Sequence, residues 1–154
     1  LALLNFQGVS RRYDIYKKIK IGKKEIIVID DYGHHPTEIR AVIEATKKGF
    51  PGKEISLVFQ PHRYSRTRDC YLDFIEILKI PEKLFLFDIY SAGEQPLENI
   101  SSSKIIKDID KEQTFYLQKF EDAKKIVSTN ISENSILIVM GAGSIGNFAK
   151  ELIG

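Results

Sequence analysis

The sequence predicts an α/β fold, namely a Rossmann-like, doubly wound sheet that is mostly parallel and has helices on both faces. Short runs of apolar, β-branched residues alternate with longer stretches in which apolar residues keep helical spacing. The apolar runs are continuous, as is typical of strands covered on both faces. Stretches long enough for a helix separate these runs, which indicates right-handed crossover connections between parallel strands.

Two local signals place the first elements. A turn at Gly22 separates residues 12–19 from residues 25–29, which predicts a hairpin or two adjacent strands. A helix is expected from Pro36, or one residue later, to Gly49, because proline suits the first helical turn and apolar residues then recur at helical spacing.

The rest of the chain continues the alternation of strand and helix. The segment between residues 90 and 101 is expected to be irregular, because Gly93 and Pro96 interrupt it. The expected strands are 55–59, 84–87, 114–117 and 136–140; the expected helices are one with the apolar stripe Tyr71, Phe74, Ile75 and Leu78, then 102–109, 121–131, and a last one that ends near Ile153.

Length and composition fit one globular domain spanning residues 1–154. The chain is 43% hydrophobic and 29% charged, which excludes a disordered, collagenous or coiled-coil protein. The single cysteine, Cys70, excludes an intrachain disulfide and favours a reducing compartment. No apolar run is long enough to span a membrane, so we expect a cytoplasmic protein without membrane contact. Because the chain begins with Leu1 instead of methionine, we expect it to be a piece of a longer protein.

The charges are unevenly distributed along the chain. Residues 1–70 carry 14 Lys and Arg against 8 Asp and Glu, a net of +6, whereas residues 71–154 carry 9 against 13, a net of −4. All six arginines lie in the first part. Since the guanidinium fork suits carboxylates and phosphates, anionic ligands are expected to meet the N-terminal half. The lysines are dispersed, so the basic balance is weak evidence for nucleic-acid binding.

Polar side chains are concentrated where the expected strands end. Ligands of parallel sheets gather beyond the carboxyl ends of the strands. This rule selects four loops as the candidate site, and the chemically useful residues lie in them: residues 30–36, 60–68, 88–96 and 141–146.

The loop of residues 30–36 carries two carboxylates, a phenol and two imidazoles. A carboxylate can accept both hydroxyls of a ribose, an imidazole exchanges protons near neutral pH, and a tyrosine ring can stack. Metal binding is disfavoured because the adjacent His34 and His35 would point in different directions on an extended loop. The alternative is that these side chains cap the following helix and bond to one another.

The loop of residues 60–68 contains three arginines and His62. Arg63 and Arg66 are three positions apart, so a helical turn would bring both to one face, where they could clamp one carboxylate. A solvated basic loop and an RNA-binding loop are the alternatives. Cys70, which follows, is expected to be a core residue and not a nucleophile.

Residues 141–146 match the pattern G-x-G-x-x-G between a strand and a helix. A dinucleotide fingerprint normally opens the first strand-helix-strand unit, but here it opens the last helix, so a tight turn that lets a ligand or backbone approach closely is favoured over NAD binding. The chain has no G-x-x-x-x-G-K-[ST] sequence, so the phosphate cradle for any nucleoside triphosphate lies elsewhere.

Five motifs in one order, spread over nearly the whole chain, resemble the C-terminal domain of the muramyl ligases, in the branch that adds L-alanine. The motifs are Gly8 to Tyr13, Asp30 to Ala41, Phe59 to Asp69, Ala92 to Glu94 and Gly141 to Gly143. The resemblance implies an enzyme of three domains, of which this chain is the last. The N-terminal domain would hold the UDP-sugar, and the central domain would hold the phosphates of ATP and the Mg²⁺ ion.

The resemblance also implies the reaction and its partners. ATP would phosphorylate the lactyl carboxylate of UDP-N-acetylmuramate, and the amine of L-alanine would attack the acyl phosphate, giving an amide in peptidoglycan precursor synthesis. The expected partners are these three molecules and the enzyme's own N-terminal and central domains, in the bacterial cytoplasm, with no nucleic acid and no membrane. The chain alone is expected to be inactive.

Seven residues receive roles from the matching motifs. Asp31 would hold the ribose hydroxyls of ATP, and Arg12 would approach its terminal phosphate. Arg63 and Arg66 would bind the carboxylate of L-alanine. The pocket around that amino acid would be shaped by His34, His62 and Tyr32. Arg12 and His34 are the catalytic candidates, and no metal ligand is expected on this domain.

Three alternatives remain open from the sequence. One is the related ligase that adds a preformed tripeptide to the same muramate in recycling, against which the Tyr32-Gly33 pair favours addition of a single amino acid. A second is a free-standing dinucleotide-binding module of Rossmann type. A third is a basic RNA-binding domain.

Overall fold

The computed structural model describes residues 11–154 of the chain. Leu1 and the segment from Gly8 to Ser10, on which sequence expectations rest, lie outside the described residues. Twelve elements occur in the described part, six of them strands. The strands are β1 (Asp14–Ile21), β2 (Lys24–Asp31), β3 (Glu54–Phe59), β4 (Lys83–Phe87), β5 (Thr114–Leu117) and β6 (Ser135–Met140).

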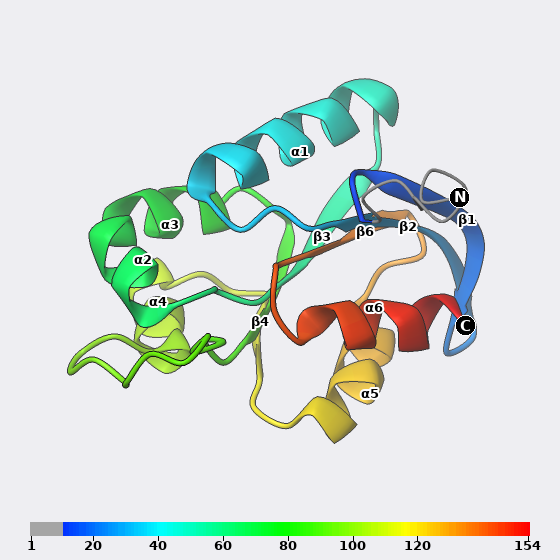
Figure 1. The fold of residues 1–154 in the computed structure, drawn as a ribbon. Coiled ribbons are helices and arrows are strands. Elements are labelled where there is room, and N and C mark those ends of the chain that lie inside the picture. Colours follow the sequence, from blue (N-terminus) through cyan, green and yellow to red (C-terminus); the bar gives the residue numbers. More distant parts are fainter. Residues whose placement is uncertain (1–10) are drawn as a thin grey trace, which may run out of the picture.

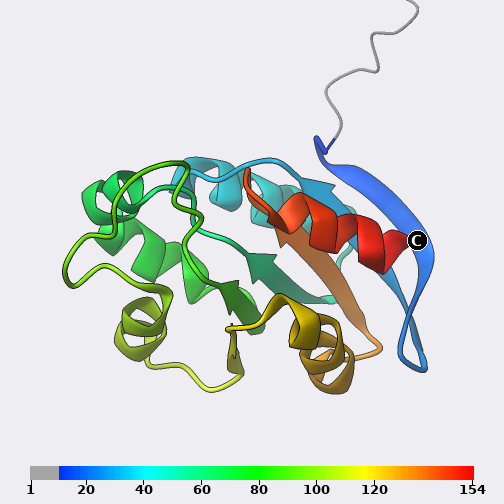
Figure 2. The same cartoon turned by 60° about the horizontal axis from the view of Figure 1, so that its bottom comes forward.

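The strands form one sheet in the order β1-β2-β6-β3-β4-β5. β1 and β2 pair antiparallel around the turn at Gly22, and all other neighbours are parallel. β6, the last strand in the chain, lies between β2 and β3 (Figures 1 and 2). The expectation of a mostly parallel sheet that begins with a hairpin is therefore confirmed.

Helices cover both faces of this sheet, as the sequence predicts. In Figure 1, α1 and α3 lie above the sheet, and α5 and α6 lie below it. The helices are α1 (Pro36–Gly49), α2 (Tyr64–Asp69), α3 (Tyr71–Leu78), α4 (Ser102–Ile109), α5 (Phe120–Asn130) and α6 (Ile145–Ile153).

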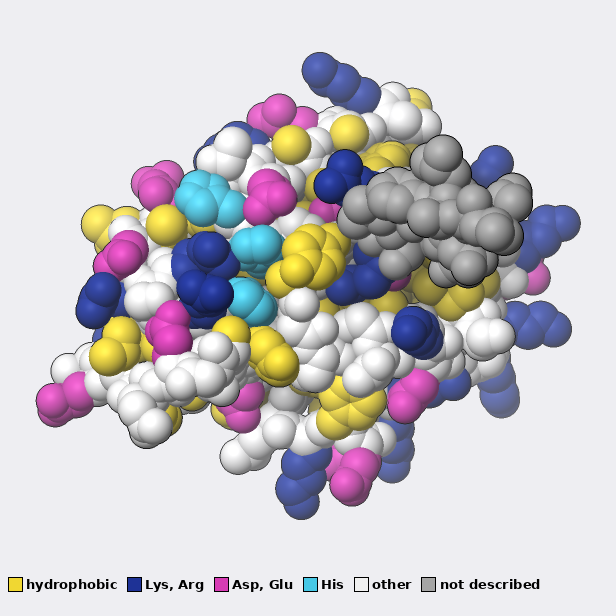
Figure 3. Space-filling view, in the orientation of Figure 1, with side chains coloured by type: hydrophobic (Ala, Val, Ile, Leu, Met, Phe, Trp, Pro, Cys, Tyr) yellow, Lys and Arg dark blue, Asp and Glu magenta, His cyan; other side chains and the backbone are white. Residues whose placement is uncertain are grey.

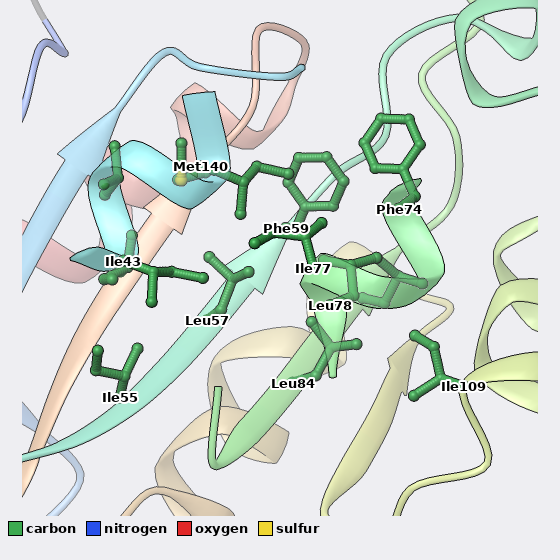
Figure 4. Close-up of a cluster of buried hydrophobic side chains, with 14 of the residues drawn as sticks. Ile43, Ile55, Leu57, Phe59, Phe74, Ile77, Leu78, Leu84, Ile109 and Met140 are labelled. Atoms are coloured by element: carbon green, nitrogen blue, oxygen red, sulfur yellow. The ribbon is translucent and has the colours of Figure 1, made fainter. Parts of the chain in front are cut away.

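Alternating residues of the strands belong to two separate hydrophobic cores, one on each face of the sheet. Leu57 and Phe59 of β3 belong to the core under α1, α3 and α4, whereas Val58 belongs to the core under α5 and α6. Figure 4 shows the first core, in which Leu57 and Phe59 lie among side chains of the covering helices. Burial on both faces explains why the strands are continuously apolar instead of alternating with polar residues.

Two expectations need correction in the segment after β3. The sequence predicts a polar loop from residue 60 to residue 68, but residues Tyr64–Asp69 form the helix α2. Cys70 was expected in the core; it packs against the first core but is only partly buried, at the junction of α2 and α3. The sequence signal was weak because α2 is a short, polar helix with one buried residue, Thr67, and so lacks an apolar stripe.

Within residues 11–154, the helices are too short or too polar to cross a membrane.

A candidate ligand site at the carboxyl edge of the sheet

The four loops selected from the sequence meet at one edge of the sheet. They follow β2, β3, β4 and β6, which are parallel, so all four leave the sheet on the same side. Contacts join them: the rings of His34 and His62 lie 5.3 Å apart, and His62 forms a parallel bridge with Tyr90. The tertiary structure thus brings together residues that lie more than 100 positions apart in the chain.

Four rings form a row across this edge. Tyr32 meets His34 edge-on at 5.8 Å, His34 meets His62 at 5.3 Å, and His62 stacks on Tyr90 at 5.5 Å with planes 17° apart. The two tyrosines at the ends are exposed to 47% and 40%. In Figure 3 the histidines lie beside a group of Lys and Arg side chains on this face. The row therefore offers flat surfaces next to positive charge.

Arg63 and Arg66 extend from the start of α2, beside this row. Arg63 precedes the helix with a φ of 73°, in the left-handed region, and its side chain is exposed. Arg66 is partly buried, and its Nη1 lies 3.5 Å from Nδ1 of His62. Arg63 stands directly before α2 and Arg66 lies in its first turn, so the two guanidinium groups start from the same end of the helix and can meet a single anion.

The pKa of His62 is lowered from its usual 6.5. Burial is the largest cause, and the charges of His34, Arg66 and Arg63 act in the same direction, opposed by Glu94. At neutral pH the imidazole of His62 is therefore uncharged and able to accept a proton.

Asp31 and Arg12 lie at a second part of the edge. Oδ1 of Asp31 accepts the N–H of Gly33 at 2.7 Å, and Oδ2 accepts the N–H of Tyr13 at 2.9 Å. Each carboxylate oxygen keeps a lone pair for a further donor, so the residue suits the hydroxyls of a ribose. A surface pocket adjoins it, lined by Arg11, Arg12, Tyr13, Asp31, Tyr32, Gly33, Glu38, Ala41 and Val42.

Arg11 and Arg12 have different environments. Arg11 forms an ion pair with Asp30 at 3.0 Å, and its Nη1 donates to the carbonyl of Gly141 at 2.7 Å. These two side chains are 14% and 7% exposed. Burial raises the pKa of Asp30, and the Arg11 guanidinium opposes that rise. Arg12 is exposed and so is the arginine available to a phosphate.

The glycine-rich loop is filled by the protein itself. Oε1 of Gln60 accepts the N–H of Ile145, the first residue of α6, and Nε2 of Gln60 donates to Oγ of Ser144, both at 3.0 Å. A Cβ on Gly143 would lie 2.5 Å from Cγ of Tyr90. This is the close approach of the polypeptide that the glycine pattern suggested. A helix N-terminus occupied by Gln60 does not offer that N–H to a pyrophosphate.

His35 stabilises the start of α1 at this edge of the sheet. It is the N-cap of α1: its Nδ1 accepts the N–H of Thr37, while Glu38 accepts the N–H of His35. Its Nε2 lies 3.7 Å from Sγ of Cys70. The alternative of helix capping therefore applies to His35, whereas His34 faces the row of rings.

Three residues of this edge received no role from the sequence, although all three lie in the selected loops: Gln60, Tyr90 and Glu94. Gln60 is 7% exposed, and its position directly after an apolar strand was an available signal for a polar group at the edge. Glu94 belongs to one of the five motifs, but its part and that of Tyr90 could not be read from the sequence, because their contacts are with residues far away in the chain. Within residues 11–154, His, Cys, Asp and Glu side chains form no group of three that would suit a metal ion.

Comparison with known proteins places these features in a family. Residues 11–143 match the family described as "Mur ligase, glutamate ligase domain". The chain is 43% identical, over 98% of its length, to the UDP-N-acetylmuramate--L-alanine ligase of Nitrosomonas eutropha, and 37% identical, over 97%, to that of Hydrogenovibrio crunogenus. It spans about one third (33%) of the length of each of these relatives.

A solved structure agrees with the sequence comparisons. The UDP-N-acetylmuramate-alanine ligase MurC of Thermotoga maritima matches 99% of this chain with a TM-score of 0.70 and 27% identity, through 31% of its own length. The family match, the sequence identity and the shared fold together show that this chain belongs to the family described as "Mur ligase, glutamate ligase domain".

Proposed function

We propose that this chain is the C-terminal domain of an ATP-dependent, ADP-forming ligase that joins L-alanine to UDP-N-acetylmuramate. The observation that carries the proposal is the 43% identity to a curated L-alanine ligase over 98% of the chain. The arginine pair beside the row of rings supports it, because a paired guanidinium site suits the carboxylate of an amino acid.

In this proposal the domain acts on the incoming amino acid. Arg63 and Arg66 hold the carboxylate of L-alanine, and His34, His62 and Tyr32 surround the rest of the molecule. Holding the carboxylate orients the amine toward an acyl phosphate formed on the UDP-N-acetylmuramate carboxylate, which is catalysis by positioning. An imidazole in the row, that of His34 or His62, receives the proton that the amine loses.

We also propose that ATP is bound between this domain and the rest of the enzyme. Asp31 accepts the ribose hydroxyls, and the exposed Arg12 approaches the terminal phosphate. The remaining phosphate contacts and the Mg²⁺ ion, which offsets the charge of the transferred phosphoryl group, belong to the central domain. We place the enzyme in the bacterial cytoplasm, since a lone cysteine and ATP dependence fit a reducing compartment.

Reconstitution tests the proposal. The chain alone is expected to release no ADP with L-alanine and UDP-N-acetylmuramate, whereas the same chain joined to its N-terminal and central domains releases ADP in an L-alanine-dependent reaction. A double variant, Arg63→Gln with Arg66→Gln, is expected to raise the KM for L-alanine by about 100-fold or more, since two charge-assisted contacts are lost. Turnover by the isolated chain would contradict the proposal.

The amino-acid acceptor decides between two ligases of this family. If the joined enzyme used a tripeptide in preference to L-alanine, the recycling ligase would be the correct assignment. NADH titration followed by fluorescence tests the dinucleotide-binding alternative, for which the occupied N-terminus of α6 leaves little support.

A further inference from the structure

The helix that carries the two arginines is capped by a residue from another loop. The side chain of the N-cap residue, Arg63, makes no hydrogen bond to the first turn of α2. Instead Glu94, in the loop after β4, accepts the N–H of Ser65 at 2.9 Å and the hydroxyl of Ser65 at 2.6 Å. Both carboxylate oxygens of Glu94 are thus used on one residue of this helix, 29 positions away in the chain.

The same loop also holds the backbone on which Arg63 sits. The N–H of Arg63 donates to the carbonyl of Tyr90 at 2.8 Å, and the N–H of Tyr90 donates to the carbonyl of Pro61 at 2.8 Å. On the helix side, Oγ1 of the fully buried Thr67 donates to the carbonyl of Arg63 at 2.8 Å. A left-handed φ at a non-glycine residue is unfavourable, and it persists here because neighbours on both sides constrain it.

The charge of Glu94 makes its location informative. Its hydrogen bonds from Ser65, followed by the charges of Arg63 and Arg68, lower the pKa of Glu94, so it is ionised at neutral pH. A carboxylate beside a site for a substrate carboxylate reduces the local positive potential and, by charge alone, weakens substrate binding. Its benefit must therefore come from orientation.

We propose that Glu94 is a positioning residue for the substrate carboxylate, because it fixes the start of α2 and with it the directions of Arg63 and Arg66. The proposal rests on the function proposed above and adds a residue to it. It implies that Glu94, in the loop after β4, changes the affinity for the amino acid without touching the amino acid itself.

Steady-state kinetics of the full-length enzyme test this role with two variants. Glu94→Gln keeps one acceptor oxygen and removes the charge, and Glu94→Ala removes both acceptors. We expect the KM for L-alanine to rise about three- to tenfold in Glu94→Gln and further in Glu94→Ala, with kcat and the KM values for ATP and UDP-N-acetylmuramate within about twofold of wild type.

The matched control is Glu98→Gln, which makes the same charge change at an exposed position of the same loop. It is expected to leave all kinetic constants unchanged. Ser65→Ala keeps the backbone N–H that Glu94 accepts and removes only the hydroxyl contact, so its KM for L-alanine should lie between those of wild type and Glu94→Ala.

Three results would overturn the role of Glu94. A lower KM for L-alanine in Glu94→Gln would show that its charge, and not its hydrogen bonds, is what matters. Unchanged constants would show that α2 needs no cap from Glu94. A loss of kcat or a rise in all three KM values in Glu94→Gln would show general structural damage.

The proposed function fails separately from this role. If the wild-type enzyme did not use L-alanine, the substrate assignment would be wrong, and the variants would then be compared with the amino acid or peptide that the wild type does use. A selective rise in that KM still supports Glu94 as the positioning residue, and its absence contradicts it.

Discussion

At the scale of single residues, two ion pairs of the same chemistry differ in burial, and burial decides how much each pair matters for stability. Arg11 and Arg68 both pair with an aspartate at about the same distance, 3.0 and 2.9 Å. The Arg11–Asp30 side chains are 14% and 7% exposed, whereas those of Arg68–Asp69 are 55% and 63% exposed. A buried charge that loses its partner costs much more than an exposed one.

The two pairs give a direct prediction. Arg11→Met leaves Asp30 buried without its guanidinium partner, so we expect the free energy of unfolding of the 154-residue chain to fall by about 3 kcal/mol. Arg68→Met, the control, is expected to change it by less than about 0.5 kcal/mol. Urea denaturation measures both, and equal losses in the two variants would contradict this interpretation.

His62 gives a prediction about pH. Its pKa in the folded chain lies below its value of about 6.5 in the unfolded chain, so between these two values the unfolded chain binds more protons. Stability is therefore complete above about pH 6.5 and falls as the pH is lowered from there toward the pKa of the folded state.

Two measurements check the titration of His62. In NMR spectra, the imidazole protons of His62 should titrate below pH 6.5, and the urea midpoint should fall less between pH 7 and pH 5.5 in His62→Asn than in the wild-type chain. An imidazole that titrates at or above pH 6.5 would contradict the prediction.

At the scale of elements, the loops after β3, β4 and β6 contact one another and so hold one another in position. Gln60 joins the loop after β3 to the start of α6, and Tyr90 lies between Gly143 and His62. Glu94 joins the loop after β4 to α2. We therefore expect movement of any one of these loops to displace the row of rings.

Gly143→Ala tests this coupling. Its added Cβ would lie 2.5 Å from Cγ of Tyr90 and 2.7 Å from Oε1 of Gln60, so we expect a loss of about 2 kcal/mol in the free energy of unfolding. The NMR signals of the His62 ring should shift too, since Tyr90 stacks on it.

Gly49→Ala is the matched control for this substitution. At the end of α1, nothing lies within 4 Å of the added methyl group, so that variant should be neutral or slightly more stable. A Gly143→Ala chain with wild-type stability and an unchanged His62 signal would show that the loops are independent.

At the scale of the whole molecule, the sheet order explains why the site is where it is. β6 comes last in the chain but lies between β2 and β3, so the glycine-rich loop after it reaches the loops after the other two strands. Four parallel strands thereby bring their carboxyl ends to one edge, which is where ligands of such sheets bind. The arginines of the N-terminal half and the loop of the last strand share that edge for this reason.

The sequence by itself determined the order of strands and helices apart from α2, the two-faced core and the four loops of the site. Those features depend on local periodicity and on turn residues such as Gly22 and Pro36, which a single chain displays directly. The family resemblance added roles for Arg63, Arg66 and the other site residues, and these roles remain predictions.

Only the tertiary structure decided which side chains hold the site together. The helix at residues 64–69 forms where the sequence predicts a loop. The buried Arg11–Asp30 pair and the contacts of Gln60, Tyr90 and Glu94 join residues 19 to 85 positions apart. Such contacts depend on the order of strands in the sheet, and no periodicity within one segment encodes it. A hydrogen bond between two loops becomes visible only when the sheet has placed both of them at the same edge.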